Sequence, residues 1–420
     1  MLLLDISLSL ILILGTLIFL VIIMLLVGML LYARKKLIPE GKVSILINNE
    51  KKLSVDVGSS LLSSLAEQQI FLPSACGGGG TCGMCKCQVN SGGGSILPTE
   101  AVHFTRKQIK ENWRLGCQVK VRGDMEITVP ASIFGIKKWE CEVISNNNVA
   151  TFIKEFVIKL PEGEFLDFRS GGYIQIDVPA GIEVNYKDFD ISETYRKEWT
   201  NLGMWNLKMK NSEPVFRAYS MANHPAEGNI IKLNVRIATP PWDKKTGSFK
   251  NVSPGICSSY IFSLKPGDKI FVSGPYGEFH VKETNKEMMF IGGGAGMAPM
   301  RSHIFDQFET LHTKRKATFW YGGRSLQELF YVEDFKKIEK ENPNFKFYIA
   351  LSEPKVEDNW TGYKGFIHQV ILDNYLNNHP EPEEIEYYLC GPPLMNAAVQ
   401  AMLDDLGVPK DNIAFDDFGS

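Results

Sequence analysis

Residues 76–85 read Cys-Gly-Gly-Gly-Gly-Thr-Cys-Gly-Met-Cys, and this stretch decides how the chain folds and what it can bind. It places Cys76, Cys82 and Cys85 on one glycine-rich loop, and Cys117 follows later in Leu-Gly-Cys-Gln-Val. Three thiolates on one loop with a distant fourth are typical of a [2Fe-2S] site. The glycines let the loop curl and point backbone N–H groups at the sulfurs. The four cysteines therefore predict a metal cluster that carries one electron at a time.

The same cysteines allow two other interpretations. Structural zinc usually takes two Cys-x2-Cys pairs, and only Cys82 and Cys85 form one here. Disulfides are rare in the reducing cytoplasm, where most of this chain is expected to lie. The gap between Cys76 and Cys82 is one residue longer than the first gap of the plant-type pattern Cys-x4-Cys-x2-Cys. This difference narrows the set of iron-sulfur families to which the chain could belong. We expect Cys87 on a strand, facing away from the site, and Cys141 in a core.

Composition bounds the possible functions. A chain of 420 residues is long enough for two or three domains. The 45 basic and 48 acidic side chains give a net charge of −3. There is therefore no global electrostatic reason to expect nucleic acid as a partner.

The N-terminus is a separate apolar segment. Residues 6–32 contain no charged side chain, and as a helix they would be about 40 Å long, enough to span a bilayer. A buried core helix would be shorter and less uniformly apolar. Asp5 precedes the run and Arg34 to Lys36 follow it, which is the reverse of a cleaved signal peptide. The positive-inside rule predicts a single-pass anchor with its N-terminus outside and the later domains in the cytoplasm.

The segment after the anchor has the pattern of a small sheet crossed by one helix. Residues 43–47 and 52–55 alternate as two strands of a hairpin, and residues 60–69 have helical spacing. Residues 125–129 read as a closing strand. Such a sheet with a cysteine loop at its rim resembles the β-grasp fold of plant-type ferredoxins.

The middle of the chain is rich in strand patterns. Residues 143–145, 150–160 and 173–178 predict strands of a barrel. Between them and the next motif lies an insert, 180–216, with many charges and scattered aromatic residues. Such aromatics could form a partner surface, but we expect them to pack the insert down locally.

Arg217-Ala218-Tyr219-Ser220 resembles the Arg-x-Tyr-Ser motif of the ferredoxin-NADP reductase superfamily. The resemblance implies FAD. Arg217 would form a charge-assisted pair with a flavin phosphate, Tyr219 would offer its ring and hydroxyl to the flavin, and Ser220 would lie near flavin N5. Taken alone, so short a motif could also be an edge strand with a surface arginine.

A second feature supports that resemblance about 35 residues later. Gly255, Ser258 and Ser259 lie where the superfamily opens a helix whose N-terminus receives the FAD pyrophosphate. The physical basis is the helix dipole together with free backbone N–H groups. The other interpretation is an ordinary helix start. Cys257 is assigned no redox role.

The last part of the chain carries a dinucleotide pattern. A buried run, 288–291, is followed at once by a glycine-rich turn that opens a helix. Further strands are predicted at 317–323, 345–351 and 386–390, which implies a doubly wound parallel sheet. The residues predicted to bind NADH at this turn are Gly292, Gly293, Gly294, Ala295, Gly296, Met297 and Pro299.

The strand at 386–390 ends in Cys390-Gly391-Pro392-Pro393, which matches the same superfamily. By this resemblance Cys390 lies beside the nicotinamide, and Gly391 and Pro392 shape that wall. The alternative is a cysteine buried at a strand end. Arg324 and Ser325 follow the second strand. By themselves, these two residues slightly favour NADPH over NADH.

The order of anchor, ferredoxin, flavin barrel and nicotinamide domain resembles the family formed by the F subunit of the bacterial Na+-translocating NADH:quinone oxidoreductase. The resemblance covers essentially the whole chain, including the ending Asp416-Asp417-Phe418-Gly419-Ser420. It implies NADH as donor, FAD as acceptor, a [2Fe-2S] outlet to other membrane subunits, and quinone reduction with Na+ translocation by the whole complex. Phe418 would shield the flavin face, and Ser220, Cys390 and Phe418 would be the catalytic residues. Phe418 could also be part of a frayed tail.

The resulting prediction is a multidomain α+β and α/β chain in the bacterial inner membrane. Its parts are a transmembrane anchor (1–36), a β-grasp [2Fe-2S] domain (37–131), an antiparallel FAD barrel (132–282) and a Rossmann-like NADH domain (283–420). Two other functions stay open: the reductase component of an oxygenase, and a non-enzymatic electron relay. The apolar run contains no charged residue that could bind an ion, so any sodium coupling must reside in partner subunits.

Overall fold

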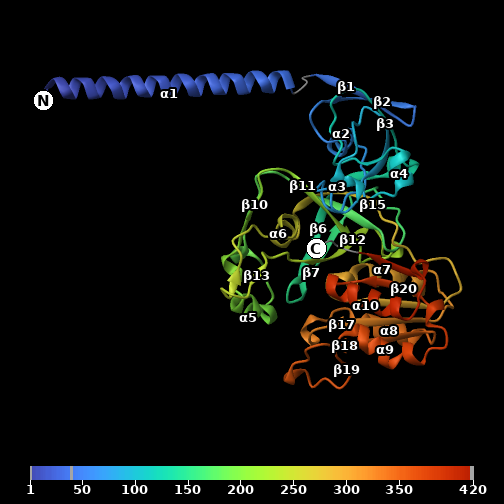
Figure 1. The fold of residues 1–420 in the computed structure, drawn as a ribbon. Coiled ribbons are helices and arrows are strands. Elements are labelled where there is room, and N and C mark those ends of the chain that lie inside the picture. The colour runs from blue at the N-terminus through green and yellow to red at the C-terminus, as the bar shows by residue number, and fades with distance from the viewer. Residues whose placement is uncertain (1, 38–40, 417–420) are drawn as a thin grey trace. The chain divides into compact units, whose positions relative to one another are not determined.

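The computed structural model describes residues 2–37 and 41–416 (Figure 1). The chain divides into two compact units. The first unit comprises Met1–Leu72 and Cys85–Ile133, and the second comprises Pro73–Met84 and Phe134–Ser420. The predicted flavin-shielding residue Phe418 lies outside the described residues.

The N-terminal helix α1 spans Leu2–Leu37 (Figure 1). Its window Leu14–Tyr32 is long and apolar enough to cross a membrane, and none of that window is buried. A helix that is apolar all round has no polar face to turn toward water, so it requires an apolar environment such as a membrane or a protein interior. The predicted apolar helix is therefore confirmed.

The first unit contains a five-stranded mixed sheet in the order β2-β1-β5-β3-β4. The strands are β1 (Lys42–Ile47), β2 (Lys51–Asp56), β3 (Lys86–Ser91), β4 (Trp113–Leu115) and β5 (Met125–Thr128). Asn48 and Asn49, both with positive φ, make the predicted hairpin turn between β1 and β2. The helices are α2 (Leu61–Glu67), α3 (Pro98–Ala101) and α4 (Arg106–Lys110). The predicted hairpin, helix and closing strand are all present.

A buried ion pair orders the loops of this unit. Arg114 on β4 approaches Glu100 to 2.5 Å, and the Glu100 side chain is fully buried. The Arg114 guanidinium also donates to the carbonyl oxygens of Gly93 and Gly94 at 3.0 and 2.9 Å. Glu100 in turn accepts the Leu115 N–H at 3.1 Å. This network therefore fixes the end of β4, two residues before Cys117.

The second unit begins with a six-stranded antiparallel sheet in the order β11-β8-β15-β6-β7-β12. The strands are β6 (Lys137–Ala150), β7 (Ile153–Lys159), β8 (Tyr173–Val178), β11 (Val215–Ser220), β12 (Ile230–Arg236) and β15 (Lys269–Tyr276). The prediction of one strand from 150 to 160 is wrong at its start. Ala150 instead ends β6 and pairs with Ile153 across a two-residue turn, because Thr151 is fully buried under the insert.

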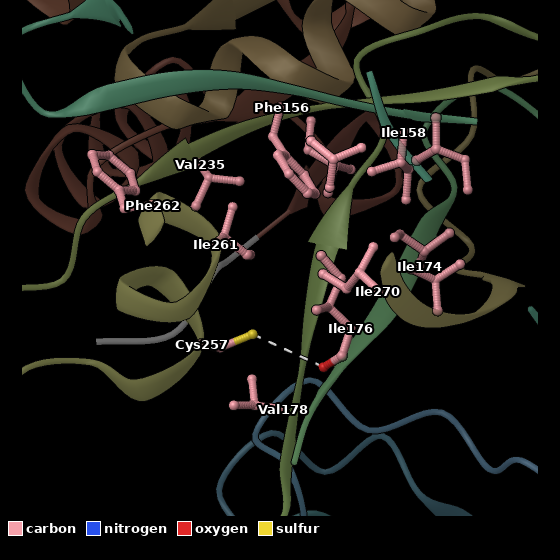
Figure 2. Close-up of a cluster of buried hydrophobic side chains, with 14 of the residues drawn as sticks. Phe156, Ile158, Ile174, Ile176, Val178, Val235, Cys257, Ile261, Phe262 and Ile270 are labelled. Atoms are coloured by element: carbon pink, nitrogen blue, oxygen red, sulfur yellow. Dashed lines mark hydrogen bonds between the residues drawn. The ribbon is translucent and has the colours of Figure 1, made fainter. Parts of the chain in front are cut away.

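Side chains from these strands and from helix α6 (Ile256–Ser263) form one hydrophobic core. Figure 2 shows part of this core, with Phe156, Val235 and Ile261 among the residues that fill it. Cys257 of α6 turns into the core, with its sulfur 3.9 Å from the Ile176 carbonyl oxygen (Figure 2). Burial raises the pKa of Cys257 to about 12. The thiol is thus a packing residue, as predicted.

The insert folds as a small layer against this core. Its elements are β9 (Glu183–Asn185), α5 (Glu193–Asn201) and β10 (Lys208–Lys210), and a separate hairpin is formed by β13 (Trp242–Asp243) and β14 (Ser248–Phe249). Trp199 is fully buried and donates its indole N–H to the Thr151 carbonyl at 2.7 Å. Tyr186 and Phe189 pack beside it. These aromatics pack locally, as expected.

The nucleotide lobe of the second unit is a six-stranded, fully parallel sheet in the order β19-β18-β17-β16-β20-β21. The strands are β16 (Met288–Gly292), β17 (Ala317–Gly323), β18 (Phe345–Leu351), β19 (Tyr363–Lys364), β20 (Glu386–Cys390) and β21 (Ile413–Asp416). The helices are α7 (Met297–Phe305), α8 (Val332–Glu341), α9 (Ile367–Asn374) and α10 (Pro393–Asp405). The predicted doubly wound sheet is confirmed, whereas β21 was not predicted.

Candidate functional site

The cysteine loop in the second unit brings two predicted ligands together. The sulfurs of Cys76 and Cys82 lie 3.3 Å apart. The hydrogen bond from Cys82 lowers the pKa of Cys76 to about 3, while the pKa of Cys82 is raised. Four glycines of the loop have positive φ, namely Gly77, Gly78, Gly80 and Gly83. The loop therefore adopts the backbone that its glycines predict and presents one readily formed thiolate.

The other two predicted ligands lie in the first unit. Cys85 and Cys117 are both buried, and the Gly116 N–H donates to the Cys85 carbonyl at 2.8 Å. A Cβ on Gly116 would lie 2.9 Å from the Leu72 side chain, so this contact requires glycine. Within residues 2–37 and 41–416, no three His, Cys, Asp or Glu side chains converge on one metal position. Cys76 and Cys82 thus belong to the second unit, and Cys85 and Cys117 belong to the first.

The remaining cysteines of the first two domains lie in cores. Cys87 on β3 is fully buried, and burial raises its pKa to about 12. Cys141 on β6 is also fully buried, with its pKa raised to about 12 for the same reason. Neither thiol is readily ionised, which agrees with their exclusion from the ligand set.

A cavity of about 520 Å³ opens within the second unit between the barrel and the nucleotide lobe. Predicted site residues in its lining are Arg217, Tyr219, Ser220, Gly255, Ser258, Ala295, Gly296, Gly391 and Pro392. Asn234 and Arg236 of β12 also line it, and the sequence analysis did not predict them. One cavity therefore joins the flavin motif, the α6 N-terminus and the glycine-rich turn.

The flavin motif occupies the end of β11. Arg217 lines the cavity, and its guanidinium donates to the Phe216 carbonyl at 2.7 Å. Burial, together with nearby Cys257, raises the pKa of Tyr219 well above its ordinary value, so Tyr219 remains a neutral phenol. A ligand in this cavity would therefore contact a cationic side chain, Arg217, and an aromatic ring, Tyr219.

Ser220 has a partner that the sequence analysis missed. Its hydroxyl donates to an Asp416 carboxylate oxygen at 2.6 Å. Asp416 ends β21 and pairs in register with Cys390, which pairs with Gly292. The ends of three parallel strands thus bring Asp416 to Ser220. Only the pairing of β21 with β20 could have revealed this, because the two residues are far apart in sequence.

The N-terminus of α6 only partly matches the prediction. Gly255 caps the helix, and a Cβ there would lie 2.6 Å from the Ala238 side chain. Ser258 lines the cavity and accepts the Ala238 N–H at 3.1 Å. Ser259, by contrast, is fully buried, donates to the Gly255 carbonyl at 2.6 Å and contacts the Tyr186 hydroxyl at 2.8 Å. Its expected place in the cavity is wrong, because the 3.6-residue helical repeat turns it into the core.

The glycine-rich turn leaves β16 and opens α7. A Cβ on Gly296 would lie 2.1 Å from the Cys390 carbonyl oxygen, and one on Gly292 would lie 2.7 Å from Met300. Glycine is therefore required for the turn to approach β20 this closely. Gly293 and Gly294 complete the turn, while Met297 and Pro299 are buried in the first turn of α7. The Met297 and Pro299 side chains therefore pack in the protein interior and do not line the cavity.

Cys390 is fully buried in the hydrophobic core of the nucleotide lobe. Gly391 and Pro392, the next two residues, line the cavity instead. The Cys390 side chain thus lies in the core, and its place beside a nicotinamide stays a prediction. The alternation of side chains along β20 explains this, because it points Cys390 to the core and leaves the following turn at the cavity.

Protein-family comparisons match three consecutive parts of the chain. A 2Fe-2S iron-sulfur cluster binding domain matches residues 45–122. An oxidoreductase FAD-binding domain matches residues 201–281, and an oxidoreductase NAD-binding domain matches residues 290–401. The four predicted cysteine ligands fall within the first range, residues 217–220 and Ser258 within the second, and the glycine-rich turn within the third.

Curated relatives match nearly the whole chain. The F subunit of the Na(+)-translocating NADH-quinone reductase of Marinomonas sp. is 57% identical and covers 97% of this chain and 98% of its own. The chain belongs to this family of F subunits. The Neisseria gonorrhoeae F subunit is also 57% identical over 97% of this chain and 99% of its own length, and that of Pseudomonas aeruginosa is 57% identical over 94% and 95%.

Solved structures share the fold of this chain at lower identity. Amycolatopsis cytochrome P450 reductase is 21% identical with a TM-score of 0.62, and covers 90% of this chain and 98% of its own. The ferredoxin reductase in carbazole 1,9a-dioxygenase is 24% identical with a TM-score of 0.59, covering 91% and 99%. The predicted multidomain fold class is thereby confirmed.

In this member of the family, Arg324 and Ser325 line a second cavity of about 180 Å³ in the second unit. Its charged lining is Glu198, Arg324, Glu328, Glu353 and Lys355. Arg324 lies 3.9 Å from Glu328, so its charge already has a partner. In doubly wound sheets this end of the second strand meets the ribose 2′ position. Three carboxylates and two cations therefore line this cavity, so its charge does not by itself favour NADPH.

Proposed function

We propose that this chain oxidises NADH on FAD and passes single electrons through a [2Fe-2S] cluster to other subunits of a Na+-translocating NADH:quinone oxidoreductase. The observation that carries the proposal is the cavity of about 520 Å³ in the second unit. It joins the Arg-Ala-Tyr-Ser strand end to the glycine-rich turn, as a hydride transfer between two nucleotides requires. FAD, when bound, would accept two electrons as a hydride and release them one at a time.

The chain's own residues would position the two nucleotides. Arg217 supplies a cation for a flavin phosphate, and the first turn of α6, with Gly255 and Ser258, lines the same cavity. The turn at Gly296 allows a dinucleotide pyrophosphate to approach the backbone. Ser220, oriented by Asp416, places a hydroxyl at the strand end where hydride is expected to arrive. The residues therefore bind and orient, and no acid–base pair is needed.

Cys76, Cys82, Cys85 and Cys117 would hold the cluster. The fit rests on the paired sulfurs of Cys76 and Cys82 and on the glycine backbone that surrounds them. Thiolate is also the ligand that such clusters require. The proposed division of the chain is 1–36 anchor, 37–131 cluster domain, 132–282 flavin domain and 283–420 nucleotide domain.

The exposed apolar helix α1 would anchor the chain in the bacterial inner membrane. With Arg34, Lys35 and Lys36 after it, we expect the N-terminus in the periplasm and all later domains in the cytoplasm. The helix would also pack against other membrane subunits of the complex. Sodium translocation would belong to that assembly rather than to this chain.

The proposal is tested on the full chain purified in detergent. We expect bound FAD, two irons per chain, and bleaching of the flavin by NADH faster than by NADPH. Preparations lacking flavin would contradict it. Co-purification with an oxygenase, and never with membranes, would instead support the second candidate function. That candidate is favoured only by the shared fold with oxygenase reductases.

A further inference from the structure

Helix α7 is attached to the chain just beyond the flavin motif. Arg301 donates to the Ala222 carbonyl at 2.8 Å, and Ser302 donates to the Asn223 carbonyl at 2.8 Å. Ala222 and Asn223 are the second and third residues after Ser220. The same helix starts at Met297, directly after the glycine-rich turn. One helix therefore connects the predicted NADH turn to the predicted flavin strand.

Arg301 also forms a buried ion pair with the barrel. Its two terminal nitrogens donate to the two Glu227 carboxylate oxygens at 2.7 and 2.8 Å. Arg301 is 5% exposed, and its guanidinium lies over the rings of Phe305 at 4.2 Å and Tyr331 at 5.1 Å. Burial alone would raise the pKa of Glu227, but the Arg301 hydrogen bonds outweigh it and the pKa is lowered. Both partners are therefore charged, and the bidentate geometry permits little sliding.

Neighbouring contacts extend this attachment along β12. The Tyr331 hydroxyl donates to Glu155 and accepts from the Asn234 side chain, the latter at 2.9 Å. Asn234 also lines the cavity. Lys232 approaches Glu227 to 3.5 Å. Arg301 thus lies at the centre of a polar contact between the nucleotide lobe and the barrel.

We propose that Arg301 is a positioning residue for hydride transfer. By holding α7 to Ala222 and Glu227, it sets the distance between a nicotinamide at the glycine-rich turn and a flavin at β11. Reacting atoms must come within about 3–3.5 Å, and a misplacement of about 1 Å can cost on the order of 100-fold in rate. The inference rests on the proposed function and adds a residue that neither the motifs nor the cavity lining identifies.

Arg315 provides a matched control. Its side chain is 10% exposed, and it pairs with Glu386 at 2.6 Å. It also donates to the carbonyl oxygens of Lys286 at 2.7 Å and Lys282 at 2.9 Å. All three partners come after β15, the last barrel strand, in the sequence, so none of them belongs to the barrel. Arg315 therefore resembles Arg301 in burial and bonding but does not attach α7 to the flavin strand.

The test compares Arg301→Met, Arg301→Lys and Arg315→Lys in the full chain in detergent. Stopped-flow absorbance measures flavin reduction over a range of NADH concentrations. We expect Arg301→Met to lower the limiting rate about 100-fold, with little change in the half-saturating NADH concentration. We expect Arg301→Lys to restore part of the rate, because it keeps the charge but loses the bidentate bond. Arg315→Lys should lower stability and leave the limiting rate within about twofold.

Hydrogen exchange of the flavin-free chain gives a readout independent of activity. The backbone amides of residues 220–223 should exchange faster in Arg301→Met than in the wild type. In Arg315→Lys they should exchange at the wild-type rate. Wild-type rates in both Arg301 variants, or equal slowing in Arg315→Lys, would overturn the inference. If Arg301→Met fails to fold, Arg301→Lys and Glu227→Gln decide the outcome by the same measurements. A wild-type flavin that NADH does not reduce would instead contradict the proposed function.

Discussion

The cysteine loop takes three of its four predicted ligands from ten consecutive residues, whereas the cavity of the second unit takes its lining from Ala75 and from segments between residue 217 and residue 393. In the loop, glycines with positive φ shape the backbone around sulfurs that belong to the same short stretch. In the cavity, glycines such as Gly296 matter because another strand passes too close for a Cβ. A site built from neighbours in sequence can be identified residue by residue, but a site built from strand ends cannot.

The difference extends to the supporting residues. In the first unit, the Arg114–Glu100 pair bonds to loops within about twenty residues of itself. In the second unit, Ser220 is oriented by Asp416, and α7 is held by a carboxylate of the barrel, Glu227. We therefore expect each site to lose function without the other, although Ala75 beside the cysteine loop also lines the cavity, and the first three predictions below test this expectation.

The largest expected effect is the loss of the cluster in Cys82→Ser. Because a ligand of the cluster is removed, iron content and visible cluster absorbance should disappear, and quinone reduction by the assembled complex should fall more than about 1,000-fold. Flavin bleaching by NADH should persist. Cys87→Ala is the control, since Cys87 is buried on β3 and is not one of the predicted ligands. Iron retained in Cys82→Ser, or lost in Cys87→Ala, would contradict the ligand assignment.

The next effect concerns stability of the first unit alone. Arg114→Met leaves the buried Glu100 carboxylate without its partner, which should cost about 3–5 kcal/mol of unfolding free energy. Urea unfolding followed by cluster absorbance should shift to lower urea, while flavin fluorescence should not. Lys107→Met is the comparison, because its exposed pair with Glu111 at 3.9 Å should contribute below about 0.5 kcal/mol. Equal shifts in both probes would show that the two sites do not fail independently.

A smaller effect tests the cavity. Ser220→Ala should slow flavin reduction on the order of 100-fold, and Asp416→Asn should slow it about tenfold because the orienting hydrogen bond weakens. Iron content should stay unchanged in both variants. Ser263→Ala, which removes a hydroxyl at the far end of α6 bonded to the Tyr260 carbonyl, should leave the rate unaffected. Comparable slowing in Ser263→Ala would indicate a general structural effect.

Acid should destabilise the second unit through His303. This histidine is fully buried, and burial first, then nearby His280, lowers its pKa to about 3. The unfolded chain takes up a proton below about pH 6.5 that the folded chain refuses until about pH 3. The His303 contribution should therefore decline by about 1.4 kcal/mol per pH unit as pH falls through that window. Urea unfolding at pH 6.5, 5.5 and 4.5 should show this slope reduced in His303→Phe.

The smallest effect concerns nucleotide choice. Glu353→Gln removes one carboxylate from the cavity that contains Arg324 and Ser325. Since Glu353 is exposed, we expect only about a threefold rise in kcat/KM for NADPH, which should shrink at high salt. The value for NADH should not change. A fall for both nucleotides would place Glu353 in binding generally rather than in discrimination.

Much of the fold could be predicted because its signals are local. Alternation gave the β1–β2 hairpin, a glycine gave the start of α6, and buried runs gave β16 and β20. Strand β21 was missed because its four residues carry no distinctive pattern and depend on pairing with β20. The turn after Ala150 was missed because Thr151 is covered by the distant Trp199.

The candidate site divides in the same way. Arg217, Tyr219, Gly255 and Gly296 line the cavity, because motifs report the backbone that must approach a ligand, and their binding roles stay predictions. Sequence spacing alone did not settle which face of α6 or β20 meets the cavity, and Ser259 and Cys390 are buried instead. Helical and strand periodicity decide that only once the neighbouring elements are known.

The sequence by itself determined the apolar helix, the four candidate thiols, the glycine turns and membership of the family of F subunits. Each of these depends on residue type and spacing along a short stretch. Only the tertiary structure decided that Asp416 orients Ser220 and that Arg301 joins α7 to Ala222 and Glu227. The physical reason is that a buried charge or hydroxyl is satisfied by whichever partner the packing of strands brings to it, and that partner can lie anywhere in the chain.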